Sequence, residues 1–241
     1  MSDWSVRISD DADSAASACA SFVLDVLRVA LDNEARATFA ISGGSSPRLL
    51  FSRLAASGFD WSRVHLFWVD ERCVPPEDNQ SNYKLANETL ITPAKINDAN
   101  VHRIQGELDP DEGARRYVKE ITEFFGSSEP PEFSLIHRGM GPDAHTASLF
   151  PGEPLIDNRT GIAAAVWVEK MKSHRVTLLP GVLLKARRTV LQVAGTDKAE
   201  ALYNVLRGPE DVKQYPCQLG TRGSSGRSAI WFLDKAAAAK L

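Results

Sequence analysis

The segment Leu135-Ile-His-Arg-Gly-Met-Gly-Pro-Asp-Ala-His-Thr-Ala-Ser-Leu-Phe-Pro-Gly152 carries the clearest signal for the fold of this chain. It begins with the apolar end of a buried strand. Two glycines and a proline then interrupt regular structure, and a helix-compatible stretch follows at residues 146–150. A strand, a glycine-rich turn and a helix place polar groups at the carboxyl edge of a parallel sheet, where open α/β folds bind ligands. We therefore expect an α/β fold with a functional site at this turn.

Asp143 and His145 stand two residues apart on the same turn. A carboxylate beside an imidazole fixes the tautomer of the ring and stabilises the imidazolium that forms when the ring accepts a proton. A histidine that merely caps or packs the turn is the alternative interpretation. Because the glycines surround this pair, we favour His145 as a catalytic base and Asp143 as its supporting carboxylate.

A second glycine turn follows the short apolar strand predicted at residues 37–42. Gly43-Gly44-Ser45-Ser46-Pro47 leads into a helix in which Leu49, Leu50 and Leu54 are expected to face inward. Glycines let the backbone approach a ligand closely, and the free N–H groups at a helix N-terminus attract anions. The turn is thus a candidate phosphate-binding loop, although a plain turn would have a similar sequence.

Three charged residues, Asp70-Glu71-Arg72, end the buried strand predicted at residues 64–69. In a parallel sheet they would lie at the same edge as the two glycine turns. Arginine can bind phosphate through two parallel hydrogen bonds, so Arg72 is a candidate phosphate ligand. The alternative is a solvated strand end. A helix begins near residues 81–83, and Asn82 is a further candidate for the site.

Strands alternate with helices along most of the chain, which predicts a parallel sheet flanked by helices. We expect a single domain over residues 1–241, since no repeat, low-complexity block or linker is visible. Outside the segments already named, four helices are expected. They lie at 13–31 (capped by Asp13 or Ser14), at 113–125, from the residues after Lys198 through 206, and in the alanine-rich tail 235–241. Further strands are expected at 101–104, 162–168, 176–179, 189–194 and 228–233.

The composition is close to that of an average soluble globular protein, with 43% hydrophobic and 24% charged residues among 241. The 28 basic and 31 acidic residues give a net charge of −3. A nucleic-acid-binding protein would carry a clustered basic face, so we expect no nucleic-acid partner. The apolar runs look shorter than the roughly 20 residues that span a bilayer, so we expect no membrane segment.

Cys19, Cys73 and Cys217 lie far apart and are odd in number, which indicates neither a disulfide framework nor a zinc site. The first residues are polar and lack the basic and then apolar pattern of a signal peptide. We therefore expect a cytoplasmic protein without a metal site. We also expect it to act as a monomer.

Taken in order, these motifs resemble the 6-phosphogluconolactonase family, and the resemblance covers most of the chain. The matching motifs are Ile-Ser-Gly-Gly-Ser-Ser-Pro at 41–47, Trp-Val-Asp-Glu-Arg at 68–72, Ser-Asn-Tyr at 81–83, Arg-Ile-Gln-Gly-Glu at 103–107, the segment 139–152, Arg-Val-Thr-Leu at 175–178 and Trp-Phe-Leu-Asp at 231–234.

The resemblance implies a three-layer, Rossmann-like α/β fold, related to the sugar-phosphate isomerases, with a mostly parallel sheet flanked by helices. It implies that the chain hydrolyses 6-phospho-D-glucono-1,5-lactone to 6-phospho-D-gluconate in the oxidative pentose phosphate pathway. It also implies that the reaction needs no organic cofactor. The expected partner is therefore a small phosphorylated sugar lactone.

Site residues follow from the same resemblance. It makes His145 the base that activates water, with Asp143 in support. It places Gly43, Gly44 and Ser45 in the loop near the sugar phosphate, and it gives Arg72 a role in binding phosphate or substrate oxygens.

A family lysine lies five residues before the arginine that opens the Arg-Val-Thr-Leu strand. Counting back from Arg175 selects Lys170 as a phosphate-binding residue, with Lys172 as the alternative. The proline-rich segment that often precedes this strand in the family is replaced here by Met171-Lys-Ser-His174.

Two further departures from the family pattern lie beside the first glycine turn. Ala144 stands where the family usually has glycine, and an alanine held at positive φ costs about 1 kcal/mol. His137-Arg138 stands where the family usually has a Leu-Gly or similar pair, which adds an imidazole and a cation next to the expected site.

Two other functions fit part of the pattern. An amino-sugar-phosphate isomerase or deaminase would share the Asp-x-His turn, but its pattern continues with a glutamate, whereas here no acid follows His145 until Glu153. A non-catalytic sugar-phosphate-binding protein would keep the phosphate loop and lose the base, yet Asp143 and His145 are both present.

Overall fold

Seven parallel strands form the central sheet of the computed structural model, which describes residues 4–221 and 229–241. Their order across the sheet is β1-β10-β9-β6-β2-β3-β5. The strands are β1 (Trp4–Ser9), β2 (Ala37–Ile41), β3 (Val64–Trp68), β5 (Val101–His102), β6 (Leu135–Arg138), β9 (Thr189–Val193) and β10 (Ala229–Asp234). The mostly parallel sheet expected from the sequence is confirmed. The first residue of the strand predicted at 228–233 lies outside the described residues.

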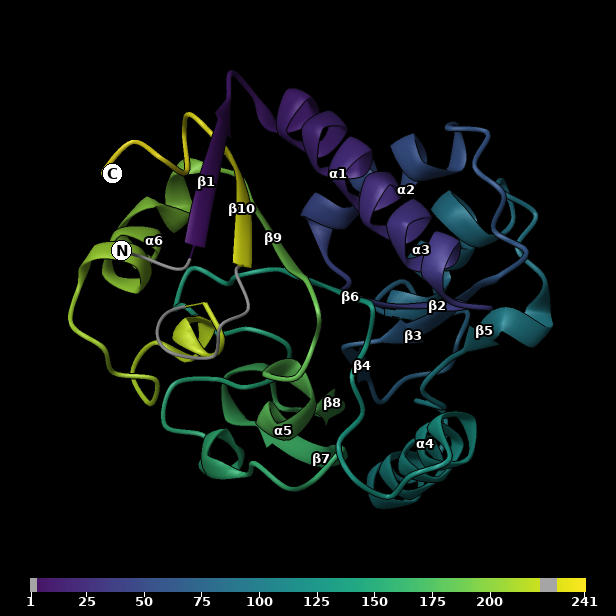
Figure 1. The fold of residues 1–241 in the computed structure, drawn as a ribbon. Helices are drawn as coiled ribbons and strands as arrows, with labels where there is room; N and C mark the ends of the chain where they lie inside the picture. Colours follow the sequence, from purple (N-terminus) through teal and green to yellow (C-terminus); the bar gives the residue numbers. More distant parts are fainter. Residues whose placement is uncertain (1–3, 222–228) are drawn as a thin grey trace.

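Helices cover both faces of this sheet and give three layers (Figure 1). On one face lie α1 (Ala12–Asn33) and α2 (Ser45–Ala55), where Phe22 packs against Phe232 with ring centroids 5.8 Å apart. On the other face lie α4 (Pro110–Phe125) and α6 (Ala199–Arg207). There Phe124 meets Phe67 at a centroid distance of 5.2 Å.

Helix α1 differs from its prediction in two respects. Asp11, not Asp13 or Ser14, caps its start, because the Asp11 carboxylate accepts the backbone N–H of Ser14 at 2.8 Å. The helix also has 22 residues and is apolar enough, by length and composition, to cross a membrane, so the apolar runs are not all too short. Its buried side includes Cys19, Val23 and Leu27, which pack into the core of the three-layer fold.

A smaller antiparallel sheet of β4 (Asp70–Arg72), β8 (Ser173–Leu178) and β7 (Ala163–Val168) lies on the α4 side. The segments expected as strands at 162–168 and 176–179 belong to this sheet. Only Val69 separates β3 from β4, so the chain passes directly from one sheet to the other. In the resulting register Arg72 faces Arg175.

Short helical segments connect the strands. They are α3 (Asn82–Ala86), a π-helical turn at Asn87–Ile91, α5 (Pro180–Leu183), and 3-10 turns at Asp98–Asn100, Pro154–Asp157, Glu169–Met171, Thr196–Lys198 and Pro216–Gln218. Residues 235–241 form turns instead of the predicted terminal helix. A seven-residue segment is too short to offset the cost of helix nucleation without a packed apolar face.

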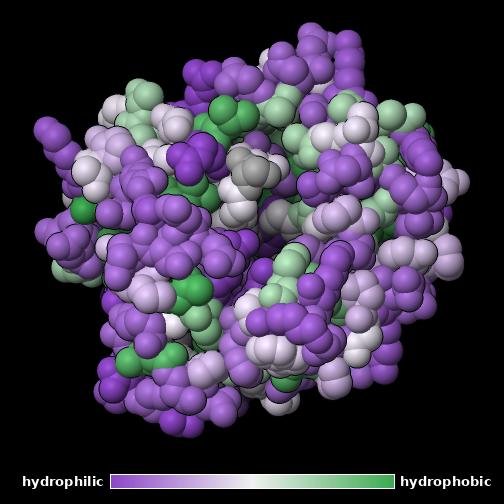
Figure 2. Space-filling view, turned by 180° about the vertical axis from the view of Figure 1, so that it is seen from behind, coloured by the Kyte–Doolittle hydropathy of each residue, from purple (hydrophilic) through white to green (hydrophobic). Residues whose placement is uncertain are grey.

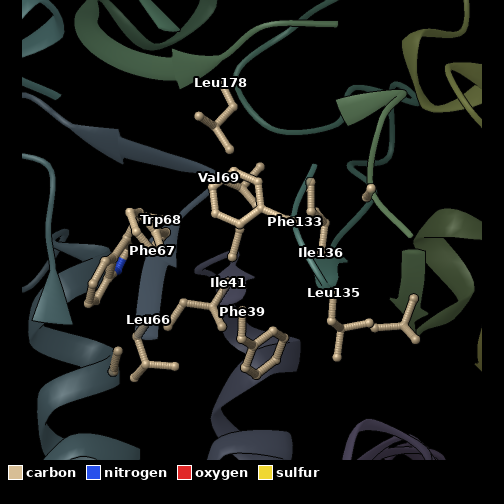
Figure 3. Packing of buried hydrophobic residues seen from close by; sticks show 14 of the residues in the cluster. Phe39, Ile41, Leu66, Phe67, Trp68, Val69, Phe133, Leu135, Ile136 and Leu178 are labelled. Carbon is tan, nitrogen blue, oxygen red and sulfur yellow. The ribbon is translucent and has the colours of Figure 1, made fainter. Parts of the chain in front are cut away.

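Buried aromatic and aliphatic side chains from β2, β3 and β6 fill the space around the central sheet (Figure 3). Phe39, Ile41, Leu66, Leu135 and Ile136 are fully buried. On α2, Leu50 and Leu54 face this core as expected, but Leu49 is 37% exposed. The core therefore holds the carboxyl ends of β2, β3 and β6 in fixed positions, which is where the polar residues gather.

Candidate active site

A cavity of about 410 Å³ opens at the carboxyl edge of the central sheet. Its wall includes the turn after β2 (Gly43 and Gly44) and the turn after β6 (Gly139 and Gly141). β2 and β6 are neighbours in the sheet, and β3 and β5 lie beyond β2 while β9 and β10 lie beyond β6. The cavity thus lies at the point where the strand order reverses, the usual ligand site of an open α/β sheet.

The turn after β6 does not continue into the predicted helix at 146–150. Ala144 and Ala147 have positive φ values of 62° and 52°, which a right-handed helix does not allow. Side-chain hydrogen bonds hold the compact turn instead: the Thr146 hydroxyl donates to the Gly139 carbonyl at 3.0 Å, and the Ser148 hydroxyl donates to Asp70 at 2.6 Å. The prediction of a helix in this segment was wrong because one local bond, within the turn, and one long-range bond, to Asp70, hold a different backbone conformation.

His145 and Asp143 are brought together on this turn. His145 Nδ1 lies 2.6 Å from Asp143 Oδ1, and the imidazole stacks on Phe150 with ring centroids 4.1 Å apart. Burial would raise the pKa of Asp143, but the hydrogen bond and charge of His145, together with Lys170, hold that pKa well below its usual range. An ionised Asp143 accepts a hydrogen bond from Nδ1–H, so the lone pair of His145 is on Nε2.

Gly141 makes this arrangement possible. A Cβ at position 141 would lie 2.1 Å from two ring atoms of His145 and 2.8 Å from Asp143 Oδ1. No atom other than hydrogen fits at that distance. The glycine at 141 is therefore required by the closeness of the imidazole, not by the backbone conformation.

In the turn after β2, too, a glycine leaves room for a neighbouring side chain. A Cβ on Gly43 would lie 1.8 Å from Asn82 Oδ1, so the absence of a side chain lets Asn82 reach the cavity wall. Gly44 has φ 107° and precedes α2, whose first residue is Ser45. The Ser45 side chain lies outside what the structure describes. The predicted loop residues Gly43 and Gly44 thus line the cavity beside the N-terminus of α2.

Glu71, the middle one of the three charged residues after β3, is buried away from the cavity. Glu71 is 2% exposed and accepts backbone N–H groups from Arg72, Asn82 and Tyr83 at 2.7–2.8 Å, as well as the Ser81 hydroxyl at 3.1 Å. Burial raises the pKa of Glu71, although these hydrogen bonds oppose the shift. Glu71 therefore anchors the start of α3 and does not face the cavity.

Positively charged side chains line the cavity from three segments. Arg72 comes from β4, Arg175 from β8 and Lys198 from the turn after β9. Asp70 is the carboxylate in the same wall, and its Oδ2 lies 3.9 Å from Arg175 Nη1. Three cations against one paired carboxylate leave the described wall with an excess of positive charge.

Lys170 lies elsewhere. Its Nζ contacts Asp143 Oδ2 at 3.1 Å, and its side chain lines a neighbouring pocket beyond Phe150 instead of the main cavity. The adjacent Met171 does line the cavity. Lys172, the sequence alternative, pairs with Glu169 on the surface.

Arg175, Lys198 and Gln192 belong to the cavity wall but were not proposed from the sequence. From the sequence, Arg175 was one of several basic residues at 169–175 that could supply a cation to an anionic substrate, and it was assigned only to a strand motif. The signal for Lys198 was available, because Gly195-Thr-Asp-Lys198 follows the carboxyl end of β9 as the other site turns follow β2 and β6. The described residues contain no group of three or more His, Cys, Asp or Glu side chains suited to a metal ion.

Comparison with known proteins gives consistent matches over nearly the full chain. The model of the family described as glucosamine-6-phosphate isomerases/6-phosphogluconolactonase matches residues 10–231. The 6-phosphogluconolactonase of Synechocystis sp. is 33% identical over 216 residues, covering 88% of each chain. That of Mycobacterium tuberculosis is 31% identical over 247 residues, covering 98% of each. The crystal structure of Thermotoga maritima 6-phosphogluconolactonase superposes with a TM-score of 0.83 at 26% identity, over 96% of this chain and 99% of that one.

Proposed function

The chain belongs to the glucosamine-6-phosphate isomerase/6-phosphogluconolactonase family, and from this membership we propose that it is a 6-phosphogluconolactonase. Such an enzyme is a carboxylic ester hydrolase that opens 6-phospho-D-glucono-1,5-lactone to 6-phospho-D-gluconate. The observation that carries the proposal is the Asp143–His145 pair, whose imidazole lines a cavity that Arg72, Arg175 and Lys198 also line. The first supplies a base for hydrolysis, and the second a site for a phosphorylated substrate.

His145 acts as the general base in this proposal. With Nδ1–H held by Asp143, Nε2 removes a proton from a water molecule as the water attacks the lactone carbonyl. The ring then returns that proton to the leaving ring oxygen, and the ionised Asp143 stabilises the imidazolium in between. A positioned base of this kind contributes roughly 10²–10⁴-fold to the rate.

The phosphate of the substrate serves as a remote handle that orients the carbonyl. Arg72 and Lys198 are its proposed ligands, together with Gly43, Gly44 and Ser45 at the N-terminus of α2, where free N–H groups favour an anion. Arg175 lies in the same wall and adds positive charge. Lys170, which sequence resemblance assigned to phosphate, contacts Asp143 in this structure and so supports the catalytic carboxylate.

An isomerase or deaminase acting on amino-sugar phosphates is less well supported. Its proton relay needs an acid that follows the Asp-x-His turn. The first acid after His145 is Glu153, whose carboxylate accepts the backbone N–H of Leu155 and lines the neighbouring pocket.

We place the enzyme in the oxidative pentose phosphate pathway of the cytoplasm, as a single-domain monomer over residues 1–241 that needs no organic cofactor and binds neither nucleic acid nor membrane. Figure 2 supports the monomer in part: on the face it shows, hydrophilic residues predominate and hydrophobic ones form only small separate areas. Stable protein interfaces usually need a larger apolar centre than such areas supply.

The test is to generate 6-phosphogluconolactone in situ and to follow its loss against the spontaneous rate. We expect the wild-type protein to exceed that rate clearly, and His145→Ala to lower kcat at least about 10²-fold. His174→Ala is the matched control, since His174 is exposed on the nearby β8 and lies outside the cavity wall. An active His145→Ala enzyme would remove the base assignment but not the lactonase. Wild-type activity no faster than background would end the lactonase proposal and direct the assay to amino-sugar phosphates.

A further inference from the structure

Gln192 is an unusual member of the cavity wall. It lies near the carboxyl end of β9, its residue is 2% exposed, and it lines the cavity together with the charged residues. Its Oε1 atom is buried and has no hydrogen-bond partner among the residues that the structure describes. A buried amide oxygen without a partner is unfavourable to the folded state, so another role has to explain it.

The imidazole of His137 is its polar neighbour within the sheet. β6 and β9 pair in parallel with His137 opposite Val190, and side chains two residues apart on a strand share a face, so His137 and Gln192 lie on the same face. His137 is completely buried, and Phe51 of α2 lies against its ring at a centroid distance of 6.4 Å. Neither ring nitrogen has a partner of good geometry in the described chain.

The protonation state of His137 suits contact with an amide. Burial lowers the pKa of His137 to about 4, although the Gln192 side chain acts in the opposite direction. A neutral imidazole has one N–H donor and one lone pair. Turning the Gln192 amide by 180° about its last side-chain bond exchanges the positions of Oε1 and Nε2. In that orientation Nε2–H donates to the lone pair of neutral His137, and Oε1 leaves its buried position and accepts a hydrogen bond from within the cavity.

We propose that Gln192, oriented by His137, binds a ring hydroxyl of the bound sugar lactone and thereby contributes to substrate specificity. The inference rests on the proposed lactonase function. The cations of the wall suit the phosphate, whereas a neutral amide oxygen is the kind of acceptor that a sugar hydroxyl needs. A buried amide rejects an analogue that lacks the hydroxyl, because the oxygen then stays unpaired. His137 is a positioning residue in this scheme, since it acts through Gln192.

The test compares wild type with Gln192→Leu on 6-phosphogluconolactone and on its 2-deoxy, 3-deoxy and 4-deoxy analogues. For one analogue we expect wild-type kcat/KM to fall about tenfold, the loss of one hydrogen bond. On the natural lactone, kcat/KM of Gln192→Leu should be lower than that of wild type by a similar factor. On that analogue, the two proteins should agree within about twofold, because the hydroxyl and the amide contribute through the same contact. Gln214→Leu, an exposed glutamine outside the cavity, is the control and should match wild type throughout.

The melting temperature shows whether the variant is folded. It should be unchanged or higher in Gln192→Leu, since leucine leaves no unpaired amide. A variant that loses the same factor on all four lactones, or on none, would overturn the inference while the lactonase stands. Wild-type turnover no faster than background would instead remove the proposed function itself.

The positioning role of His137 is tested on the same pair of lactones. His137→Leu should lower the preference for the natural lactone over the deoxy analogue, and His137→Gln, which restores a polar partner, should recover part of it. Unchanged preference in His137→Leu would show that Gln192 does not depend on His137.

Discussion

At the scale of single residues, the site depends on the absence of a side chain at position 141. A methyl group there would overlap His145 Nδ1 and Cε1 at 2.1 Å, and the backbone of Gly141 itself has no positive φ that alanine would resist. We therefore predict that Gly141→Ala folds but displaces the imidazole from Asp143. Catalysis should fall about 10²-fold, because a shift of about 1 Å in a catalytic group has effects of that size. Steady-state kinetics on the lactone measures it.

Gly139→Ala is the matched comparison on the same turn. A Cβ at position 139 meets no atom within 4 Å, so this change leaves the His145–Asp143 contact in place. Gly139→Ala should keep at least ten times more activity than Gly141→Ala. Equal losses in the two would show that the turn, not the space beside the imidazole, sets the rate.

The sequence allowed the prediction that Asp143 and His145 form a pair, because two residues on one turn cannot lie far apart. The family resemblance also pointed to position 144, where glycine is usual and where φ is 62° although the residue is alanine. The contact between Lys170 and Asp143 could not be foreseen, since it depends on how the β7–β8 hairpin folds back over the turn after β6.

At the scale of elements, Glu71 couples the small sheet to the start of α3. Its carboxylate accepts four hydrogen bonds, from three backbone N–H groups and one hydroxyl. Glutamine would place an NH2 group against some of these donors and leave them unpaired. We predict that Glu71→Gln lowers the free energy of unfolding by about 3 kcal/mol, the scale of breaking bonds to a buried charge. Urea denaturation measures the change.

Activity should fall with stability in that variant, since Asn82 donates to the Asp70 carbonyl and lines the cavity from the first turn of α3. Glu77→Gln, a change at an exposed carboxylate a few residues away, should stay within about 0.5 kcal/mol of wild type. A Glu71→Gln protein as stable as this control would mean that the four contacts contribute little.

Elements were predictable from the sequence where the apolar pattern was clear, as in the buried run of β3 and the amphipathic stripe of α4. They were less predictable where polar side chains compete with the backbone. Residues 146–150 have helix-compatible composition, but the hydroxyls of Thr146 and Ser148 bind outside the segment. The β4 segment was predicted to end a strand, and its place in a second sheet depends on pairing with β8, about a hundred residues later.

At the scale of the whole molecule, the cavity wall combines segments that are distant in sequence. Arg72, Arg175 and Lys198 meet only because parallel strands end at one edge and the small sheet packs beside them. The sequence identified the edge through its glycine turns. It did not identify Arg175 or Gln192, since both lie within strands, where a polar residue gives no sign of which cavity it will line.

Burial of neutral His137 also makes the stability of the whole fold depend on pH. The pKa of His137 is about 4 in the folded protein and about 6.5 in an unfolded chain. Between these values the unfolded chain binds a proton that the folded protein excludes, so stability rises with pH across this window. The contribution is complete above about pH 6.5, and it is lost as pH falls from there to about 4.

We predict that the unfolding free energy of wild type minus that of His137→Leu decreases by about 1.4 kcal/mol for each unit by which pH falls within this window, on the order of 3 kcal/mol in total. Taking the difference removes the contribution of His65, whose pKa burial also lowers to about 4, because His65 is present in both proteins. Urea denaturation at pH 4.5, 5.5, 6.5 and 7.5 measures it. A difference that stays constant with pH would mean that the folded protein admits the proton at His137, and that the imidazole is not held neutral beneath Gln192.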